Sequence, residues 1–495
     1  MIKLIAGELK AQEKEQLTQT ENAAWMFKTS GQNLLDMNFR VASYRGMNED
    51  EIIGDWIKAF AENPELAVKW LFFARDVRGG LGERRLFRII MEHLSKTEKR
   101  FLKLLKYVPE YGRWDDLLTA YDSNKTVVVS LIKEQLEIDK VNMKNGKSVS
   151  IMAKWLPSVN TSCKEVKKLG RSLAKELGLT ERDYRKTLAD LRKYLDVTEV
   201  KAASNRWGEI DYPKVSSQAN IKYKTAFYRH DHDRRAAYLE KVEKGETKIN
   251  AGTLFPHDIV HQYNTDKPVI DSAIEALWNN LPDYGIENTL VVADGSGSMY
   301  SILPGTGAIA VEVANAIAIY CSERNSAEFK NKYITFSENP QYVDFTNCTS
   351  LLSKLQLAYK YNEVANTDIY KVFKLILDTA VKNKMKQKDF VKNILVISDM
   401  EFDQGASNAN ESLFTKIAKE YKKAGYKLPR LIFWNVNSRT MAVPINTNKL
   451  GVCLVSGFSV HIVKMVVSGK LDPFEALKEV LMSERYKNIT LKEVS

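Results

Sequence analysis

The fold of the second part of the chain is decided by the stretch Asn288-Thr-Leu-Val-Val-Ala-Asp294-Gly-Ser-Gly-Ser298. Its first six residues are dominated by an apolar, β-branched run, which predicts a strand buried in a parallel sheet. The intervening glycines allow the backbone to turn tightly after Asp294. Because Ser296 and Ser298 alternate with these glycines, we expect one carboxylate and two hydroxyl groups on the same side of the loop.

Strands and helices alternate from this stretch onward. Further strands are predicted at residues 332–337, 393–399, 429–436 and 451–456. Helices are predicted at residues 309–324, 369–381, 413–424 and 474–482. This alternation predicts a doubly wound, Rossmann-like α/β domain at residues 286–495.

Oxygen-bearing side chains gather at the carboxyl edge of the predicted sheet, where domains of this class bind ligands. Besides the Asp294 loop, the run Asn-Thr-Asp at residues 366–368 comes just before a helix, and Asp399 ends a strand. Hard oxygen ligands of this kind favour Mg²⁺, or Mn²⁺, over zinc.

This pattern resembles the metal-ion-dependent adhesion site of von Willebrand A domains and integrin I domains. By that resemblance the metal ligands are Asp294, Ser296, Ser298, Thr367 and Asp399. That family often leaves the last coordination position to an acid from another molecule, which implies an acidic protein partner. The alternative is a metal-free loop that the hydroxyl groups only cap.

The first 285 residues read as helices. Residues 48–60 place apolar side chains on one face at i, i+3 and i+4 spacing. Residues 162–177 and 180–195 predict a hairpin of two helices, in which Gly178 ends the first and Thr180 caps the second. Such helices, joined by short turns, predict an all-α, HEAT-like α-solenoid at residues 1–285.

The net charge of the 495-residue chain is +11, and its location is informative. Residues 140–230 hold 20 Lys and Arg against nine Asp and Glu, which accounts for the whole excess. A basic stretch favours a polyanion-binding surface. Solvated helix faces that happen to be rich in Lys would have the same composition.

The best candidates for phosphate contacts recur at helical spacing on the predicted hairpin. They are Lys164, Lys167, Lys168, Arg171, Lys175, Arg182, Arg185 and Lys186. Aromatic residues are interleaved with the cations of the basic stretch, and two or three exposed ones are expected to stack on unpaired bases. They are Trp155, Tyr184, Tyr194, Trp207, Tyr212, Tyr223, Phe227 and Tyr228.

A second basic group surrounds a glycine-rich turn that leads into a helix N-terminus, a place that can bind phosphate. It consists of Arg75, Arg78, Arg84 and Arg85. The alternative is a plain helix-turn-helix in which Arg75 pairs with Asp76 or Glu83.

Location and redox state follow from what the sequence lacks. No apolar run reaches the roughly 18–20 residues of a membrane helix, and the N-terminus is too short and too charged for a secretory signal. We therefore expect a cytoplasmic protein without a membrane partner. The scattered cysteines predict neither a disulfide framework nor a zinc cluster.

The order of a helical part and an A-type domain resembles the Ro autoantigen and its bacterial relatives, the TROVE-module RNA-binding proteins. In them a ring of HEAT-like helices is closed by a von Willebrand A domain and binds small noncoding RNAs and single-stranded RNA ends. Motifs at residues 73–85, 111–116 and 255–260 are more similar to a domain-of-unknown-function family of large DNA viruses, phages, fungi and plants with the same layout.

Signatures of catalysis are weak. His257 and His261 have the i, i+4 spacing of a zinc-peptidase helix, but the intervening acid is Asp258 rather than Glu and no clear third ligand follows. Neither a Ser-His-Asp order near a sheet edge nor a dinucleotide fingerprint is present. Hydrolysis of a phosphodiester with two metal ions, using Asp399, Glu401 and Asp403, is a minor alternative.

These patterns together predict a non-catalytic RNA-binding scaffold, the protein part of a ribonucleoprotein, with a divalent metal in its A-type domain. The alternative is a metal-dependent protein-binding module of a larger assembly, such as a virion, that binds no RNA.

Overall fold

The computed structural model describes residues 17–19, 25–283, 288–304, 307–337, 339–362, 369–399, 411–436, 452–456 and 472–492. The chain divides into two compact units, and neither is continuous in sequence. One, here called the α/β unit, comprises Met1–Ala67 and Leu254–Glu484, and the other, here called the helical unit, comprises Val68–Thr253 and Arg485–Ser495. The division into domains at residues 1–285 and 286–495 stays a prediction from the sequence.

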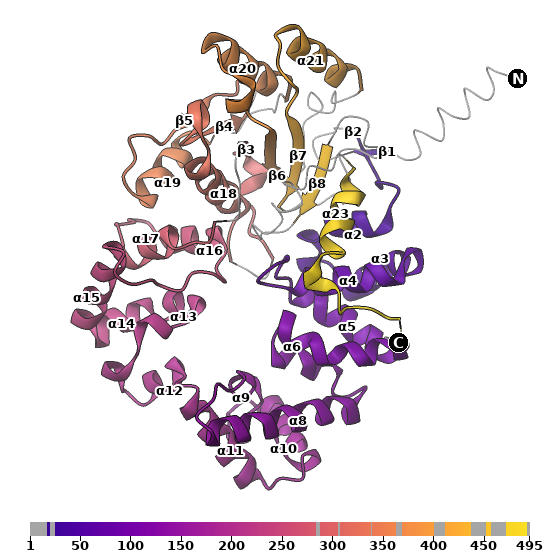
Figure 1. Cartoon of the computed structure of the whole chain (residues 1–495), viewed down its shortest axis with the longest axis vertical. Coiled ribbons are helices and arrows are strands. Elements are labelled where there is room, and N and C mark those ends of the chain that lie inside the picture. The colour runs from indigo at the N-terminus through magenta and orange to yellow at the C-terminus, as the bar shows by residue number, and fades with distance from the viewer. Residues whose placement is uncertain are drawn as a thin grey trace, which may run out of the picture. The chain divides into compact units, whose positions relative to one another are not determined.

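The α/β unit is built on a mixed sheet of six described strands in the order β5-β4-β3-β6-β7-β8 (Figure 1). They are β3 (Thr289–Asp294), β4 (Lys332–Phe336), β5 (Tyr342–Asp344), β6 (Asn393–Ser398), β7 (Arg430–Asn435) and β8 (Val452–Ser456). All neighbouring strands are parallel except β4 and β5. The central β3 and β6 are buried along their whole length, in agreement with their apolar sequences.

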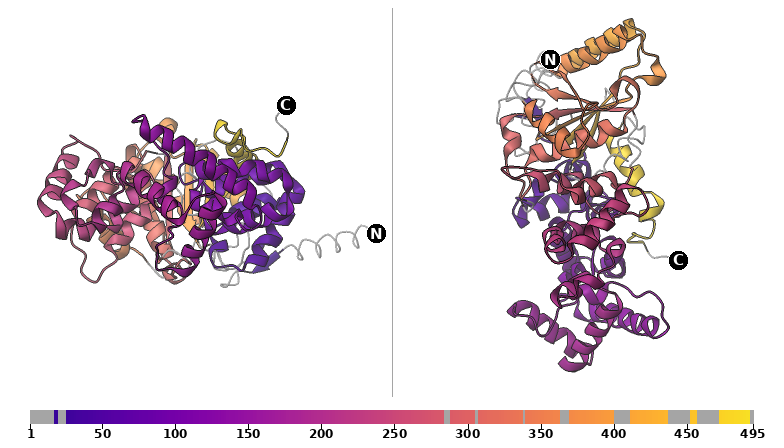
Figure 2. Two further views of the ribbon diagram at one scale, coloured as in Figure 1. Left: turned by 90° about the horizontal axis from the view of Figure 1, so that it is seen from below. Right: turned by 90° about the vertical axis from the view of Figure 1, so that its left-hand side faces the viewer.

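Helices pack on both faces of this sheet (Figures 1 and 2). The larger ones are α18 (Ala310–Arg324), α19 (Leu351–Lys360), α20 (Ile369–Lys382), α21 (Glu411–Lys423) and α23 (Pro473–Leu481). Alternate strand residues, such as Leu290 and Val292, share one apolar core with α20 and α21. The buried residues of α18 are not part of that core, and this helix packs across β3 and β4 from the other face.

Segments from the first 283 residues complete the α/β unit. They are β1 (Leu17–Gln19), β2 (Trp25–Phe27), α2 (Asn33–Phe39), α3 (Glu49–Glu62), α16 (Pro256–Val260) and α17 (Ser272–Asn279). The helix α2 lies beside β8: Asn435 Nδ2 donates to Phe39 O at 2.9 Å, and Ala42 N donates to Ser456 Oγ at 3.2 Å. From α17, Trp278 Nε1 donates to the carboxylate of Glu323 at 3.0 Å.

The helical unit consists of short helices and 3-10 turns. Its helices are α4 (Pro64–Arg75, whose first residues belong to the α/β unit), α5 (Arg85–Thr97), α6 (Val108–Tyr111), α7 (Trp114–Leu117), α8 (Lys125–Lys144), α9 (Met152–Trp155), α10 (Lys164–Glu176), α11 (Glu181–Tyr194), α12 (Thr198–Ala203), α13 (Ser217–Lys222), α14 (Lys224–His230) and α15 (His232–Glu243). The longer 3-10 turn Lys99–Tyr107 follows α5. The predicted hairpin is confirmed as α10 and α11.

Residues from near the other end of the chain finish the core of the helical unit. Tyr486 is 1% exposed, stacks on Tyr111 with ring centroids 5.6 Å apart, and donates from its hydroxyl to Asp76 at 3.0 Å. Arg485 forms an ion pair with the same Asp76. Because Tyr486 and Asp76 are buried, the segment is an integral part of the core.

The coarse fold agrees with the sequence, whereas two details differ. A helix-rich part and an α/β part with strands near the predicted positions are both present, but the sheet is not wholly parallel, because β5 is an antiparallel edge strand. Neither β5 nor α19 is among the predicted elements. The strand β5 has only three residues, whereas α19 has buried Leu351, Leu355 and Ala358 at helical spacing after a Ser350 cap, a signal that the sequence does contain. No helix among the described residues has the length and apolar character needed to cross a membrane.

Candidate functional site

The Asp294 loop lies at the carboxyl end of β3. The buried carboxylate of Asp294 accepts hydrogen bonds from Ser296 N at 2.9 Å and from Ser398 Oγ, at the end of β6, at 2.6 Å. The hydroxyl groups of Ser296 and Ser298 are 3.1 Å apart. The loop therefore presents two hydroxyl oxygens together, next to a carboxylate that also holds two adjacent strand ends in place.

Asp399, the first residue after β6, is fully buried. The pairing of Ala293 with Ile397 puts Asp294 level with Ser398, so Asp399 extends one residue beyond them at the same sheet edge. The ends of β3 and β6 are thus brought together as the sequence suggests. The remaining predicted ligand, Thr367, lies outside the described residues, as do Glu401 and Asp403.

The loop has no room for a larger residue at Gly295. A Cβ atom there would stand 2.9 Å from Asn362 Cα and 3.1 Å from Asn362 Oδ1. Because the closest atom belongs to the backbone, it cannot swing aside as a long side chain can. The glycine therefore permits close packing of the loop against the segment that precedes residues 363–368.

The donor set suits a hard divalent cation in its chemistry, since it consists of carboxylate and hydroxyl oxygens. The described residues contain no cluster of three or more His, Cys, Asp or Glu side chains that could hold a metal ion. The predicted set is of another kind, because only two of its five members are carboxylates. The metal site therefore stays a prediction.

Apolar side chains are exposed beside the loop. Tyr300, two residues after Ser298, is 45% exposed, and Ile302 is 70% exposed. The hydroxyl of Tyr300 accepts a hydrogen bond from Asn362 Nδ2 at 3.4 Å. The rim of the loop is thus partly apolar, an arrangement that suits contact with another molecule.

The histidine pair at residues 257 and 261 has structural roles. His257 is 4% exposed, and burial, the largest effect, lowers its pKa from 6.5 to about 4. The Nδ1 atom of His261 lies 2.9 Å from Glu312 Oε2, on the first turn of α18. The contact with Glu312 therefore joins His261, just after α16, to α18.

The basic hairpin of α10 and α11 is firmly built. Gly178 adopts a φ of +72° between the helices, and Thr180 Oγ1 accepts from Asp183 N at 3.1 Å to cap α11. The guanidinium of Arg192 donates to Ala153 O, Leu156 O and Ser158 Oγ at 2.7–2.9 Å. These bonds anchor α11 to the segment around α9.

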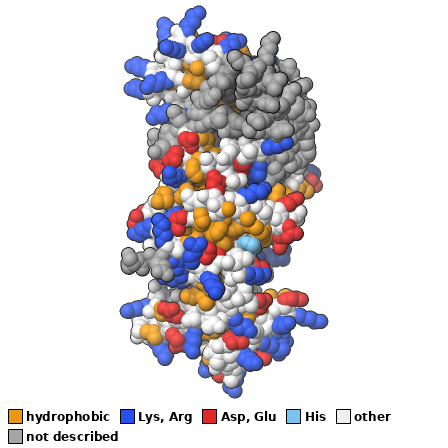
Figure 3. Space-filling view, turned by 90° about the vertical axis from the view of Figure 1, so that its right-hand side faces the viewer, with side chains coloured by type: hydrophobic (Ala, Val, Ile, Leu, Met, Phe, Trp, Pro, Cys, Tyr) orange, Lys and Arg blue, Asp and Glu red, His pale blue; other side chains and the backbone are white. Residues whose placement is uncertain are grey.

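Seven of the eight predicted RNA-contacting cations are exposed, and Lys167 is half-buried. Within the described part of the chain, Arg171 is the only one of the eight that forms an ion pair, with Glu181 Oε1 at 3.0 Å. Lys and Arg are interspersed with Asp and Glu over much of the face drawn in Figure 3. The two helices of the hairpin hold ten Lys and Arg against five Asp and Glu, so the hairpin carries a net positive charge.

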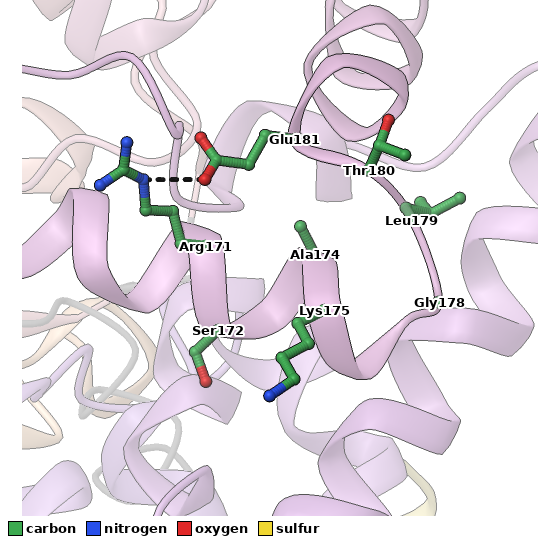
Figure 4. Close-up of a pocket in the computed structure, with 8 residues that line it drawn as sticks. All are labelled: Arg171, Ser172, Ala174, Lys175, Gly178, Leu179, Thr180 and Glu181. Carbon is green, nitrogen blue, oxygen red and sulfur yellow. Dashed lines mark ion pairs between the residues drawn. The ribbon is translucent and has the colours of Figure 1, made fainter.

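Arg171 and Glu181 also border a hollow of about 580 Å³ between the end of α10 and the start of α11 (Figure 4). Ala174 of α10 and Leu179 of the following turn contribute apolar lining, and Lys175 of α10 also borders the hollow. In Figure 4 the ion pair spans the gap between the two helices. It links the two helices and offsets the charge of Arg171.

Two of the eight aromatic residues of the basic stretch are exposed, within the expected number. Tyr228 is 68% exposed and lies edge-on to His232, with ring centroids 4.6 Å apart, and Tyr194 is 39% exposed. Tyr184, Tyr212 and Phe227 are buried in the core. Trp207 is half-buried and stacks on His230, with ring centroids 4.7 Å apart.

Around the glycine-rich turn after Arg75, the ion pairs differ from the expected ones. Arg75 is buried and pairs with Asp116 at 2.7 Å, rather than with its sequence neighbours Asp76 or Glu83. Arg88 and Arg113, which the sequence does not single out, bind the same pair of acids, Asp115 and Asp116. The adjacent acids in Tyr-Gly-Arg-Trp-Asp-Asp at residues 111–116 were the available signal, but their partners are distant in sequence.

Comparisons with known proteins agree with part of the sequence reading. Residues 288–493 match the family model "Domain of unknown function (DUF7788)", and residues 121–283 match "Domain of unknown function (DUF2828)". The chain is 29% identical over 509 residues to the uncharacterized protein L728 of Acanthamoeba polyphaga mimivirus, across 94% of this chain and 87% of the relative. Similarity to domains of unknown function and to an uncharacterized mimivirus protein is therefore shown, whereas a relationship to Ro stays a prediction.

Proposed function

We propose that this protein is a non-catalytic RNA-binding scaffold of the Ro type. In this proposal the helical unit is HEAT-like and binds small noncoding or single-stranded RNA in the cytoplasm. The α/β unit is a von Willebrand A domain with a divalent metal. The order of a helix-rich part before an α/β part with a mixed, centrally parallel sheet supports the comparison with Ro.

The observation that carries the proposal is the unpaired charge of the hairpin. Cations on a protein surface are ordinarily interspersed with acids, which limits their mutual repulsion. Lys164, Lys167, Lys168, Lys175, Arg182, Arg185 and Lys186 lack an ion-pair partner among the described residues. A polyanion would supply the missing negative charge and release bound counterions, which favours association.

Exposed aromatic rings support RNA rather than a protein polyanion. The ring of Tyr228 is exposed on α14 in the same basic stretch, edge-on to His232. A ring of this kind stacks on an unpaired base, a contact worth about 1–3 kcal/mol per base. An acidic protein would have less use for such a ring.

The metal part of the proposal rests on the oxygen donors at the end of β3 and β6. Asp294, Ser296, Ser298, Thr367 and Asp399 would hold Mg²⁺ or Mn²⁺. Bound there, the ion supplies a Lewis-acidic position that a carboxylate from a partner can occupy. The chain's own residues contribute the rigid loop, fixed by the bond from Ser398 to Asp294.

A protein-binding module of a larger, virion-like assembly is the second candidate. The exposed Tyr300 and Ile302 beside the metal loop favour it, since an apolar rim around a polar centre is the usual anatomy of a protein interface. In this version an acidic protein binds the metal loop and the basic hairpin contacts no RNA.

Filter binding of structured and single-stranded RNA tests the first proposal. The variant carries Lys168→Glu, Arg182→Glu and Lys186→Glu. We expect its RNA affinity to fall at least tenfold at moderate salt, because like charge then faces the phosphates. The matched control reverses three exposed cations elsewhere in the helical unit, Lys133, Lys241 and Lys248. RNA retention unchanged by the hairpin variant, or equally reduced by the control, would refute the proposal.

Affinity capture with the Asp294→Ala variant tests the second candidate. A protein partner that wild type retains in Mg²⁺ and loses in a chelator should also be lost by this variant. If RNA binding survives the substitution, the two units have separate binding roles. If wild type retains no Mg²⁺-dependent protein, the second candidate is rejected.

A further inference from the structure

The helix α5 begins in an unusual way. Its N-cap residue is Arg84, whose side chain makes no capping hydrogen bond, and its first turn contains no acidic residue. Helix N-termini carry partial positive charge and ordinarily begin with Ser, Thr, Asp or Asn, followed by acids. Glu83, which precedes Arg84, is buried and engaged with other groups. A cation at this position therefore adds to the positive potential.

Arg84 is close to two further guanidinium groups. Arg88 lies one helical turn after it on the same face of α5. Arg88 Nη2 and Arg113 Nη2 each lie 2.8 Å from the same atom, Asp115 Oδ2, so these two guanidinium groups are neighbours. Burial and then the charges of Arg113 and Arg88 lower the pKa of Arg84.

The local acids are too few to balance these cations. Asp116 is fully buried and accepts hydrogen bonds from Arg75 Nε at 2.8 Å and from Arg88 Nε at 2.6 Å. Asp115 accepts hydrogen bonds from Arg88 and Arg113. Three guanidinium groups, those of Arg75, Arg88 and Arg113, thus share two carboxylates, and in the described part of the chain the side chain of Arg84 forms neither an ion pair nor a hydrogen bond.

Two members of the cluster, Arg88 and Arg113, are held in place and still reach solvent. The guanidinium of Arg113 stacks on the ring of Trp155 at 4.0 Å from its centroid, and the ion pairs hold Arg88. The side chains of Arg88 and Arg113 are nevertheless 32% and 26% exposed. A ligand would find these donors already ordered, so little conformational entropy is lost when it binds.

We propose that Arg84, Arg88 and Arg113, together with the N-terminus of α5, form a binding site for a phosphate group. The planar fork of arginine matches phosphate oxygens in bidentate geometry. A phosphate brings up to two negative charges, which offset the two unbalanced guanidinium groups. This site goes beyond the proposed RNA hairpin, because it uses other helices and needs only a phosphate group, whatever molecule carries it.

Thermal unfolding of the full chain in inorganic phosphate, against chloride of equal ionic strength, tests the site. Wild type should gain about 3 °C more than Arg84→Ala, the shift expected when a ligand well above its Kd binds only the folded state. Arg84→Lys should keep part of the gain, since it retains the charge without the fork. The matched control Arg229→Ala removes one exposed arginine of the same unit and should behave as wild type.

Two results would overturn the site: Arg84→Ala keeping the full gain, or Arg229→Ala losing as much. Adenosine monophosphate and a single-stranded RNA of about 12 nucleotides, tested in the same way, identify the source of the phosphate. An absence of Arg84-dependent stabilisation by both also contradicts the proposal. The hairpin charge-reversal variant should keep its response to phosphate, so failure of the RNA proposal leaves this site testable.

Discussion

At the scale of single residues, Gly295 shapes the Asp294 loop, the proposed metal site. We predict that Gly295→Ala weakens Mg²⁺ binding at least tenfold, because the new Cβ must displace the backbone at Asn362, 2.9 Å away. Isothermal titration calorimetry measures the affinity. The control is Gly425→Ala, where φ is +82° but nothing lies within 4 Å of the new Cβ. It should cost about 1 kcal/mol of stability and leave Mg²⁺ affinity unchanged. Equal Mg²⁺ affinities in Gly295→Ala and wild type would show that the loop does not bind the ion.

His257 gives the α/β unit a pH dependence of known sign. Its folded pKa of about 4 lies below the value of about 6.5 in an unfolded chain. The unfolded chain therefore binds more protons in this window, and the stability contributed by neutral His257 is present above pH 6.5 and lost as the pH falls through 4. The full loss is about 3 kcal/mol.

We predict that His257→Gln flattens the fall in unfolding free energy between pH 6.5 and 4, measured by denaturant titration at a series of pH values. The control is His232→Gln, which alters a side chain that is 53% exposed and should leave the slope as in wild type. A slope unchanged by His257→Gln would assign the pH dependence to other groups.

At the scale of elements, the segment around Tyr486 behaves as part of the helical core. Tyr486→Ala should destabilise the helical unit by about 3–5 kcal/mol, as expected for emptying a fully buried aromatic site. Tyr486→Phe should cost only about 1 kcal/mol, the loss of the hydrogen bond to Asp76. Chemical denaturation followed by circular dichroism measures both. Tyr228→Ala, at an exposed ring, should change stability by less than about 0.5 kcal/mol; a similar small effect of Tyr486→Ala would contradict the assigned role.

Local patterns explain which elements could be predicted. The apolar runs of β3 and β6 and the caps at Gly178 and Thr180 act over a few residues, so the sequence displays them directly. The position of α2 beside β8 depends on Asn435 reaching Phe39 across 396 residues. The pairing of Arg75 and Arg88 with Asp116 likewise depends on how α5 and α7 pack. No rule based on spacing in the sequence predicts such distant partners. For the same reason the sequence indicates Arg84 as part of the proposed phosphate site, but not Arg88 or Arg113.

At the scale of the whole molecule, the charge should set how RNA binding responds to salt. The seven unpaired hairpin cations predict a steep slope of log affinity against log salt concentration. Each lost phosphate contact lowers the slope by about 0.7 for single-stranded RNA. Removing three cations should therefore reduce it by about 2, measured by filter binding over a salt series. The triple control at Lys133, Lys241 and Lys248 should keep the wild-type slope; identical slopes in all three proteins would mean that the hairpin makes no phosphate contacts.

The completion of the helical core by Arg485 and Tyr486 has a consequence for synthesis. Lys69 Nζ donates to Tyr486 O, a partner 417 residues later in the chain. While a ribosome translates the 231 residues Leu254–Glu484, Asp76 and Tyr111 lack their contacts with Tyr486. Contacts of such long range also slow folding. During this period the helical core of the nascent chain is incomplete. Its folding therefore depends on protection by chaperones and on translation reaching Arg485 and Tyr486.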